Sequence, residues 1–282
     1  MTLLVQITDT HVVERGKLLY DKADTALHLA ETVNEINAMR PQPDAVLITG
    51  DLVERPGPVT YSHFQDLIEP LKAPTYLMPG NHDSPEFMAE FFADTPMFPA
   101  EAPHYQYAID DFPLRILMLN SHLDRSELPA FGPRRMEWLQ NELQKSNKPT
   151  LVAIHHPPMK TGIGFIDMVG EEWYRELAPL FRSNPHVKKI ICGHGHVDLN
   201  GMLGAIPVQM VGSIAHQLIA GRVLDVAPSF ENRRVPPMLH HFLDGEILSG
   251  YAAWPADTDA ERIDKSSGIP WDQLKQKMRG MG

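Results

Sequence analysis

The stretch "DAVLITGD" (residues 44–51) joins an apolar run to a glycine–aspartate pair, and it decides the fold class. A continuous apolar run of this length is typical of a strand buried on both faces of a sheet. The polar pair follows at the carboxyl end, where α/β proteins place their ligands. The stretch therefore predicts a buried strand that presents Asp51 in a loop at the edge of a sheet.

The same arrangement recurs at four other places along the chain. These are "LLVQIT" (3–8) before Asp9 and His11, "TYLMP" (75–79) before "GNHD", "TLVAI" (150–154) before "HHPP", and "KKIIC" (188–192) before "GHGH". Apolar residues at helical spacing predict helices at 24–39 and 133–145, with weaker patterns at 60–71 and 171–182. Further strands are expected at 104–109, 115–120, 206–211, 238–243 and 246–251, and an Asp-Gly pair predicts a hairpin between the last two.

Length and composition fit one α/β domain followed by a short C-terminal segment. The chain has 282 residues, of which 43% are hydrophobic and 22% charged, as in an ordinary globular protein. We expect this domain of helix-covered sheets to span residues 1–251. The polar segment 252–282 becomes weakly helical from Trp271 and would form a tail, a cap or an oligomerisation arm, so a homo-oligomer stays open.

Charge, cysteine content and hydropathy narrow the class of protein further. The net charge of -11 disfavours binding to nucleic acid, whose phosphates would be repelled. The single cysteine excludes an internal disulfide framework. Neither a secretory signal nor an apolar run of membrane-spanning length is recognisable. We therefore expect a cytoplasmic protein that spans no membrane and acts on a small molecule.

The five loops supply the residue types that bind metal ions. Their carboxylates, imidazoles and one amide come from Asp9, His11, Asp51, Asn81, His82, Asp83, His155, His156, His194 and His196. Such ligands suit Fe, Mn, Zn or Co and do not choose among them. They are too many for one tetrahedral ion and about enough for two ions that share a bridge, a known device for displacement at phosphorus.

The hexapeptide "ICGHGH" (191–196) offers a second interpretation of the same residues. Its one cysteine and two histidines could form a zinc site by themselves. Cys192, however, closes a predicted buried strand, where an unpaired cysteine behaves as a small hydrophobe. We therefore expect the two histidines to belong to the larger set and Cys192 to belong to the core.

Taken in order, the five blocks resemble those of the calcineurin-like metallophosphoesterases. They read Asp9-x-His11, Gly50-Asp51-x-x-Glu54, Gly80-Asn81-His82-Asp83, His155-His156-Pro157-Pro158 and Gly193-His194-x-His196. The pattern is most similar to the bacterial branch of class III cyclic-nucleotide phosphodiesterases and glycerophosphodiesterases. The resemblance implies a four-layer α/β/β/α sandwich of two mixed sheets flanked by helices.

The resemblance also implies roles for individual residues. Asp9, His11 and His196 would hold the first of two divalent ions; Asn81, His155 and His194 would hold the second; Asp51 would bridge both. His82 would protonate the leaving oxygen or bind the phosphate, and Asp83 would orient it. Asn81, His82 and His216 would contact the substrate.

The function expected from these roles is hydrolysis of a small phosphodiester, either a cyclic nucleotide or a glycerophosphodiester. A metal-bridging hydroxide would attack phosphorus in line with the leaving alcohol. A phosphomonoesterase or nuclease of the same fold, and a non-catalytic scaffold, are the alternatives. The roles of Tyr20, Glu54 and His122 stay open: we expect Glu54 to be a solvated or salt-bridged loop residue, and His156 to lie behind the ligands or against Pro157.

Overall fold

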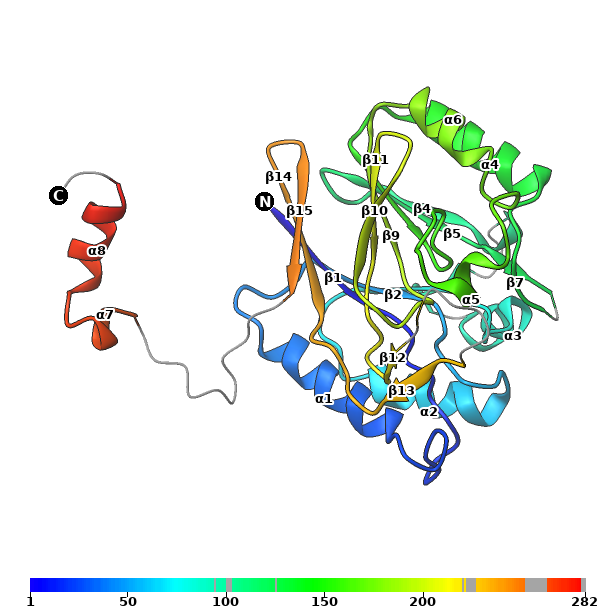
Figure 1. Ribbon diagram of the computed structural model, residues 1–282, viewed down its shortest axis with the longest axis horizontal. Helices are drawn as coiled ribbons and strands as arrows, with labels where there is room; N and C mark the ends of the chain where they lie inside the picture. The colour runs from blue at the N-terminus through cyan, green and yellow to red at the C-terminus, as the bar shows by residue number, and fades with distance from the viewer. Residues whose placement is uncertain are drawn as a thin grey trace. The chain divides into compact units, whose positions relative to one another are not determined.

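The computed structural model describes residues 1–93, 95–99, 103–124, 126–219, 221, 227–251 and 263–279 (Figure 1). Contacts divide the chain into two units, Met1–Ala252 and Ala253–Gly282. In the second unit the described residues form two short helices, α7 (Ile263–Ser266) and α8 (Trp271–Met278). The role expected for residues 252–282 stays a prediction, and residues 252–262 and 280–282 lie outside the described part of the chain.

A five-stranded sheet in the first unit has the order β15-β14-β1-β2-β3. Its strands are β1 (Thr2–Ile7), β2 (Ala45–Thr49), β3 (Thr75–Met78), β14 (Met238–Leu243) and β15 (Glu246–Tyr251). The first three run parallel, so their carboxyl ends share one edge, whereas β14 pairs antiparallel with β1. The predicted hairpin is confirmed, because Asp244 and Gly245 both adopt positive φ between β14 and β15.

A six-stranded sheet has the order β10-β11-β9-β8-β5-β4. Its strands are β4 (Tyr107–Ile109), β5 (Arg115–Leu119), β8 (Thr150–Ile154), β9 (Val187–Cys192), β10 (Leu199–Leu203) and β11 (Ile206–Met210). The central four strands are parallel and the outer two are antiparallel. Two short ribbons pair β6 (His122–Leu123) with β7 (Ser126–Pro129), and β12 (Gln217–Ile219) with β13 (Ser229–Glu231).

Helices cover the two sheets on opposite sides, which gives the expected α/β/β/α sandwich. The helices of this unit are α1 (Thr25–Ala38), α2 (Pro58–Ile68), α3 (Pro85–Phe91), α4 (Pro133–Lys145), α5 (Gly164–Asp167) and α6 (Leu177–Arg182), with a 3₁₀ turn at Pro103–Tyr105. In Figure 1, α1 and α2 lie on one side of the pair of sheets and α4 and α6 on the other. Apolar side chains of α4 and α6 form a core with the six-stranded sheet, and that core includes Cys192.

Some sequence predictions differ from the observed elements. The helix expected at 171–182 begins only at Leu177. The strand expected at 104–109 begins only at Tyr107, because the chain forms a 3₁₀ turn at Pro103–Tyr105 with positive φ at His104 and Tyr105. Strand β10 was not predicted, since the interior Gly201 weakens a strand pattern. The structure explains this glycine: a Cβ there would collide with the Met159 sulfur.

Candidate metal centre

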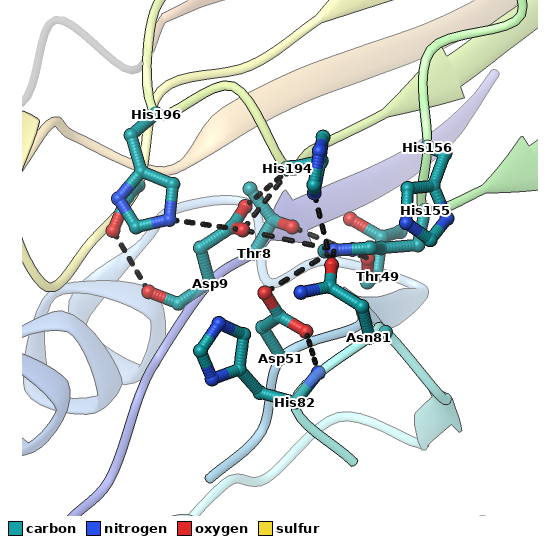
Figure 2. Close-up of polar contacts among 12 residues, drawn as sticks. Thr8, Asp9, Thr49, Asp51, Asn81, His82, His155, His156, His194 and His196 are labelled. Atoms are coloured by element: carbon teal, nitrogen blue, oxygen red, sulfur yellow. Dashed lines mark hydrogen bonds and ion pairs between the residues drawn. The ribbon is translucent and has the colours of Figure 1, made fainter. Parts of the chain in front are cut away.

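The carboxyl ends of five parallel strands deliver the predicted residues to one place between the two sheets (Figure 2). Loops after β1, β2 and β3 carry Asp9 with His11, Asp51 and Asn81, and loops after β8 and β9 carry His155 and the pair His194 and His196. Figure 2 shows Asp9 beside His194 and His196, and Asp51 between His82 and His155. Each sheet thus contributes about half of the donors.

The backbone of these loops is held in a conformation that L-residues rarely adopt. Asp9, His11, Asp51, His194 and His196 have φ of 53°, 41°, 52°, 71° and 49°. The left-handed region costs a non-glycine residue about 1–2 kcal/mol, so the surrounding structure must hold it. Strain of this kind concentrates at functional sites.

Two glycines make room for the carboxylates. A Cβ at Gly80 would collide with the carboxylate and amide of Asp51, and one at Gly193 would collide with Thr8 and the carboxylate of Asp9. The motifs therefore need glycine at these positions because the neighbouring backbone passes so close to the acidic side chains.

The first group of donors consists of Asp9, His11, Asp51 and His196, all of them buried. His11 Nε2 lies 3.0 Å from His196 Nε2 and 3.5 Å from Asp51 Oδ2. His196 Nε2 lies 3.3 Å from Asp9 Oδ1. Ligands of one ion with bonds of about 2.1 Å lie roughly 3.0–3.4 Å apart, so this group fits a metal ion.

The second group consists of Asp51, Asn81, His155 and His194. His155 Nε2 lies 3.3 Å from Asp51 Oδ2 and 3.2 Å from Asn81 Oδ1. His194 Nδ1 lies 2.9 Å from the same Asn81 oxygen. Asp51 Oδ2 therefore faces an imidazole of each group, while its Oδ1 accepts a hydrogen bond of 2.9 Å from the His82 amide. The shared oxygen is the feature expected of a bridging carboxylate.

The far ring nitrogens of three histidines are already occupied, which fixes their tautomers. His11 Nδ1 lies 2.8 Å from Glu54 Oε2, His155 Nδ1 donates to the Thr49 carbonyl at 2.9 Å, and His196 Nδ1 donates to the His216 carbonyl at 3.0 Å. In the neutral rings each Nε2 then carries a lone pair that points into the cluster. Two such lone pairs, on His11 and His196, lie 3.0 Å apart and repel each other unless a cation lies between them.

The pKa values of the acidic and imidazole groups also indicate that the cluster is stabilised by positive charge. Burial opposes ionisation of Asp9 and Asp51, but neighbouring imidazoles outweigh it and hold the pKa of both carboxyls below the usual range. Burial also disfavours charged His155, yet Asp51 and Asp9 raise its pKa to about 9. Burial and the charge of His155 lower the pKa of His194 to about 3. In the absence of metal, one proton on His155 therefore takes the place of a cation.

His82 lies at the rim of the cluster and contacts two carboxylates that the motifs did not assign to it. Its Nδ1 donates to the Glu54 carbonyl at 3.1 Å and lies 3.6 Å from Glu54 Oε2, while its Nε2 lies 3.7 Å from Glu127 Oε2. Burial opposes the charged ring, but Asp51 and Glu54 outweigh it and raise the pKa of His82. The half-buried imidazole can therefore hold a proton on the pocket side.

Among the described residues, Asp83 makes no direct contact with the His82 ring, and its expected role in orienting His82 stays a prediction. Its Oδ2 accepts from the amides of Leu52 and Gly80 at 3.1 and 2.9 Å, and its Oδ1 accepts from the Tyr61 hydroxyl at 3.2 Å. The Asp83 side chain is thus directed into the interior. Burial and the charge of Asp51 raise its pKa to about 7.

The sequence predicts a solvated or salt-bridged Glu54 and does not single out Glu127. Glu54 is salt-bridged: it is the carboxylate behind His11, a contact that the G-D-x-x-E spacing could have suggested. Glu127, in β7, accepts from Asn81 Nδ2 at 2.5 Å and so keeps the amide oxygen turned towards His155 and His194. It belongs to no motif, so the sequence offered no signal for it.

The donors open into a pocket of about 700 Å³ that both His82 and His216 line. The His216 ring lies 4.4 Å from the His196 ring, and its Nδ1 has no hydrogen-bond partner among the described residues. Burial and the charge of His196 lower its pKa to about 3. Tyr20 also lines this pocket, 5.7 Å from the His216 ring. The pocket thus extends from the donor cluster to the aromatic rings of His216 and Tyr20.

Three other residues that the sequence analysis considered, His156, His122 and Cys192, lie outside the cluster. The His156 ring lies 4.5 Å from the His194 ring, and its Nδ1 pairs with Ser121 Oγ at 2.8 Å. His122 Nδ1 pairs with the Gly80 carbonyl at 3.2 Å. Cys192 is buried, its thiol contacts the Gln209 carbonyl, and burial raises its pKa well above the ordinary value.

Comparison with known proteins assigns this fold and site to a class. The family model described as calcineurin-like phosphoesterase matches residues 2–198, and the chain belongs to that family. A probable glycerophosphodiester phosphodiesterase GpdQ of Arcobacter nitrofigilis is 32% identical over 254 residues, which cover 89% of this chain and 93% of the relative. The 3',5'-cyclic adenosine monophosphate phosphodiesterase CpdA of Escherichia coli is 29% identical over 201 residues, 70% of each chain.

Solved structures agree with the fold. A dimetal phosphatase from Danio rerio superposes with a TM-score of 0.60 at 12% identity, covering 89% of this chain and 99% of that one. At this identity the likeness concerns the architecture alone. No helix in the described part of the chain is long and apolar enough to cross a membrane.

Proposed function

We propose that the chain hydrolyses a small phosphodiester, a cyclic nucleotide or a glycerophosphodiester, at a centre that holds two divalent metal ions. The family, the relatives and the buried cluster together identify a metal-dependent phosphodiesterase. The number of ions and the choice of substrate are the proposal. The observation that carries it is the shared Asp51 Oδ2, 3.5 Å from His11 Nε2 and 3.3 Å from His155 Nε2.

Each residue has a defined task in this proposal. Asp9, His11 and His196 hold the first ion, Asn81, His155 and His194 hold the second, and Asp51 serves both. When bound, such ions polarise phosphoryl oxygens and lower the pKa of coordinated water. Because two carboxylates do not neutralise two dications, the occupied site attracts an anion although the chain carries -11 overall.

His82 assists the departure of the alcohol. Its Nδ1 is engaged by the Glu54 carbonyl, which leaves Nε2 on the pocket side. As the bond from phosphorus to the ester oxygen breaks, the Nε2 proton passes to that oxygen and the alcohol leaves neutral. Asn81, His82 and His216 face the same pocket and would contact the bound diester.

A panel of substrates tests this function. Protein loaded with Mn²⁺ is assayed with bis-p-nitrophenyl phosphate, p-nitrophenyl phosphate, cyclic AMP, glycerophosphoethanolamine and single-stranded DNA. We expect hydrolysis of the first compound and of at least one of the two small natural diesters. Preference for the monoester or for DNA would contradict the proposed substrate class. Metal analysis that finds one ion or none in active protein would contradict the two-ion centre.

A further inference from the structure

A chain of polar side chains crosses the interior between the two sheets, behind the candidate metal centre. Gln6 in β1 and His240 in β14 are both buried, with exposures of 0% and 1%. His240 Nε2 lies 3.0 Å from Gln6 Oε1, and His240 Nδ1 lies 2.6 Å from Ser249 Oγ in β15. Lys189, in β9 of the other sheet, donates to the same Ser249 oxygen at 2.5 Å. Buried polar groups that are paired at every step form a defined network.

The hydrogen bonds of this chain all run in one direction. An ammonium can only donate, so Ser249 Oγ accepts from Lys189 and gives its own proton to His240 Nδ1. The proton of neutral His240 then lies on Nε2 and is donated to Gln6 Oε1. Burial and the charge of Lys189 lower the pKa of His240 to about 3, which keeps the ring neutral. The lysine end therefore fixes the orientation of the Gln6 amide.

With its oxygen held by His240, the Gln6 amide nitrogen reaches one acceptor in each sheet. It donates to Thr49 Oγ1 in β2 at 2.9 Å and to the Cys192 carbonyl in β9 at 3.2 Å. Both acceptors stand two residues before a proposed ligand, Asp51 and His194 respectively. One planar amide thus ties together the two strand ends that carry donors from opposite sheets.

We infer that Gln6, oriented by His240, is a positioning residue that sets the spacing of the two sheets at the metal centre and thereby the affinity for the second ion. The inference rests on the proposed two-ion function. The second ion is singled out because Thr49 holds one of its ligands directly. The Thr49 carbonyl accepts from His155 Nδ1 at 2.9 Å, so a shift of Thr49 moves a proposed ligand directly.

The first ion is tied to this network less directly. It shares Asp51, but its imidazoles, His11 and His196, are held by Glu54 and by the His216 carbonyl, and neither contact involves Thr49 or Cys192. Loss of the hydrogen bonds of the Gln6 amide should therefore weaken the second binding step and change the first step little. A purely structural role would instead lower the stability of the whole domain.

Calorimetric titration of the metal-free full chain with Mn²⁺ tests the inference. We compare wild type with Gln6→Met, which keeps the volume and removes both donors, and with His240→Leu. The second step should weaken about tenfold in both, as for other residues that orient metal ligands, and the first step should change little. His240→Gln, which keeps an N–H donor for Gln6, should restore most of the affinity.

Leu143→Ala is the control, because Leu143 lies in the core between α4 and the six-stranded sheet and its side chain forms none of the hydrogen bonds of this network. Its free energy of unfolding is measured beside that of Gln6→Met. An equal weakening of the second step in Leu143→Ala would overturn the inference, as would an unchanged second step in Gln6→Met.

Two further outcomes keep the test decisive. If Gln6→Met does not fold, Ser249→Ala cuts the network at its half-buried outer end. It should weaken the second step by a few fold, and no change there would count against the inference. A wild type that binds a single ion contradicts the proposed two-ion function itself. An unchanged second step in Gln6→Met contradicts only the role inferred for Gln6.

Discussion

The two halves of the candidate metal centre differ in charge and in what stands behind them. The first half is Asp9, His11 and His196; the second half is Asn81, His155 and His194. The first contains a carboxylate of its own and has the Glu54 carboxylate behind His11 at 2.8 Å. In the second half a neutral amide takes the place of that carboxylate, and a backbone carbonyl stands behind His155.

This difference teaches that a near-symmetric set of donors need not bind two equal ions. Affinity for a hard dication rises with the number of charged oxygens around it. We therefore expect the first half to bind more tightly and the second to release its ion first on chelation. The two halves share the Asp51 carboxylate, so the sharpest experiment removes it.

Replacing Asp51 with alanine should have the largest effect. Both halves lose their common oxygen, and the His82 amide loses its acceptor. If each ion contributes several kcal/mol to the transition state, turnover should fall by at least about 10⁴-fold. Asp66→Asn is the control, since it removes an exposed carboxylate that pairs only with Arg15 among the contacts described. Retention of two ions by Asp51→Ala would show that the halves are independent.

His82→Ala should leave both halves filled and still abolish most turnover. His82 contacts Asp51 through its backbone amide, which alanine keeps, so metal content should stay near that of wild type. Loss of a proton donor should lower kcat by about 10²–10³-fold, and least for substrates with an acidic leaving group such as p-nitrophenol. Metal analysis beside kinetics decides the matter, since a fall in metal content would make His82 part of the ligand set.

Exchanging charge between the halves tests the comparison directly. Asn81→Asp should tighten the second step, and Asp9→Asn should weaken the first, each by about ten- to a hundredfold on the scale known for perturbed metal sites. Because Asn81 donates to Glu127, the first change is made together with Glu127→Gln to avoid two facing carboxylates. Stepwise Mn²⁺ titration is the measurement. If both changes leave the affinities of the two binding steps unaltered, ligand charge does not set the order of binding.

Glu54→Gln should weaken the first half alone, by about tenfold. Glutamine keeps an oxygen for His11 Nδ1 but loses the charge that makes the imidazole a better ligand. The second step should be unchanged, because the Glu54 carboxylate contacts His11 and His82 and, among the described residues, no ligand of the second half. Glu14→Gln, a nearby exposed change of the same kind, serves as the control. A weaker second step would remove the basis for treating the halves separately.

Local patterns identified the donors that the structure brings together, because each lies within a few residues of a recognisable strand end. "DAVLITGD" places Asp51 without any knowledge of the rest of the chain. The apolar runs did not reveal which strands share a sheet, since pairing depends on contacts between distant segments. Residues that support the ligands were missed for the same reason: Glu127 meets Asn81 from 46 positions away, on a ribbon without a motif.

Asp83 illustrates a different physical problem. A carboxylate next to an imidazole in sequence suggests a pair, yet these two side chains lie on different sides of the loop. Asp83 turns inward to the amides of Leu52 and Gly80, and His82 turns to the pocket. The contact that His82 does make, with the Glu54 carbonyl, depends on how two loops fold over each other, which their separate sequences do not state.

Cys192→Ala should have the smallest effect. It distinguishes the role of the Cys192 side chain from the role of its backbone carbonyl. The thiol faces the core and the Gln209 carbonyl, whereas the backbone carbonyl of the same residue accepts from Gln6. Alanine removes the first contact and keeps the second, so both metal-binding steps should stay within about twofold of wild type. Stability should fall by about 1 kcal/mol for the small cavity, measured by denaturant unfolding. Loss of one metal equivalent would instead make the Cys192 thiol a metal ligand. It would favour a separate metal site at "ICGHGH" over the two unequal halves.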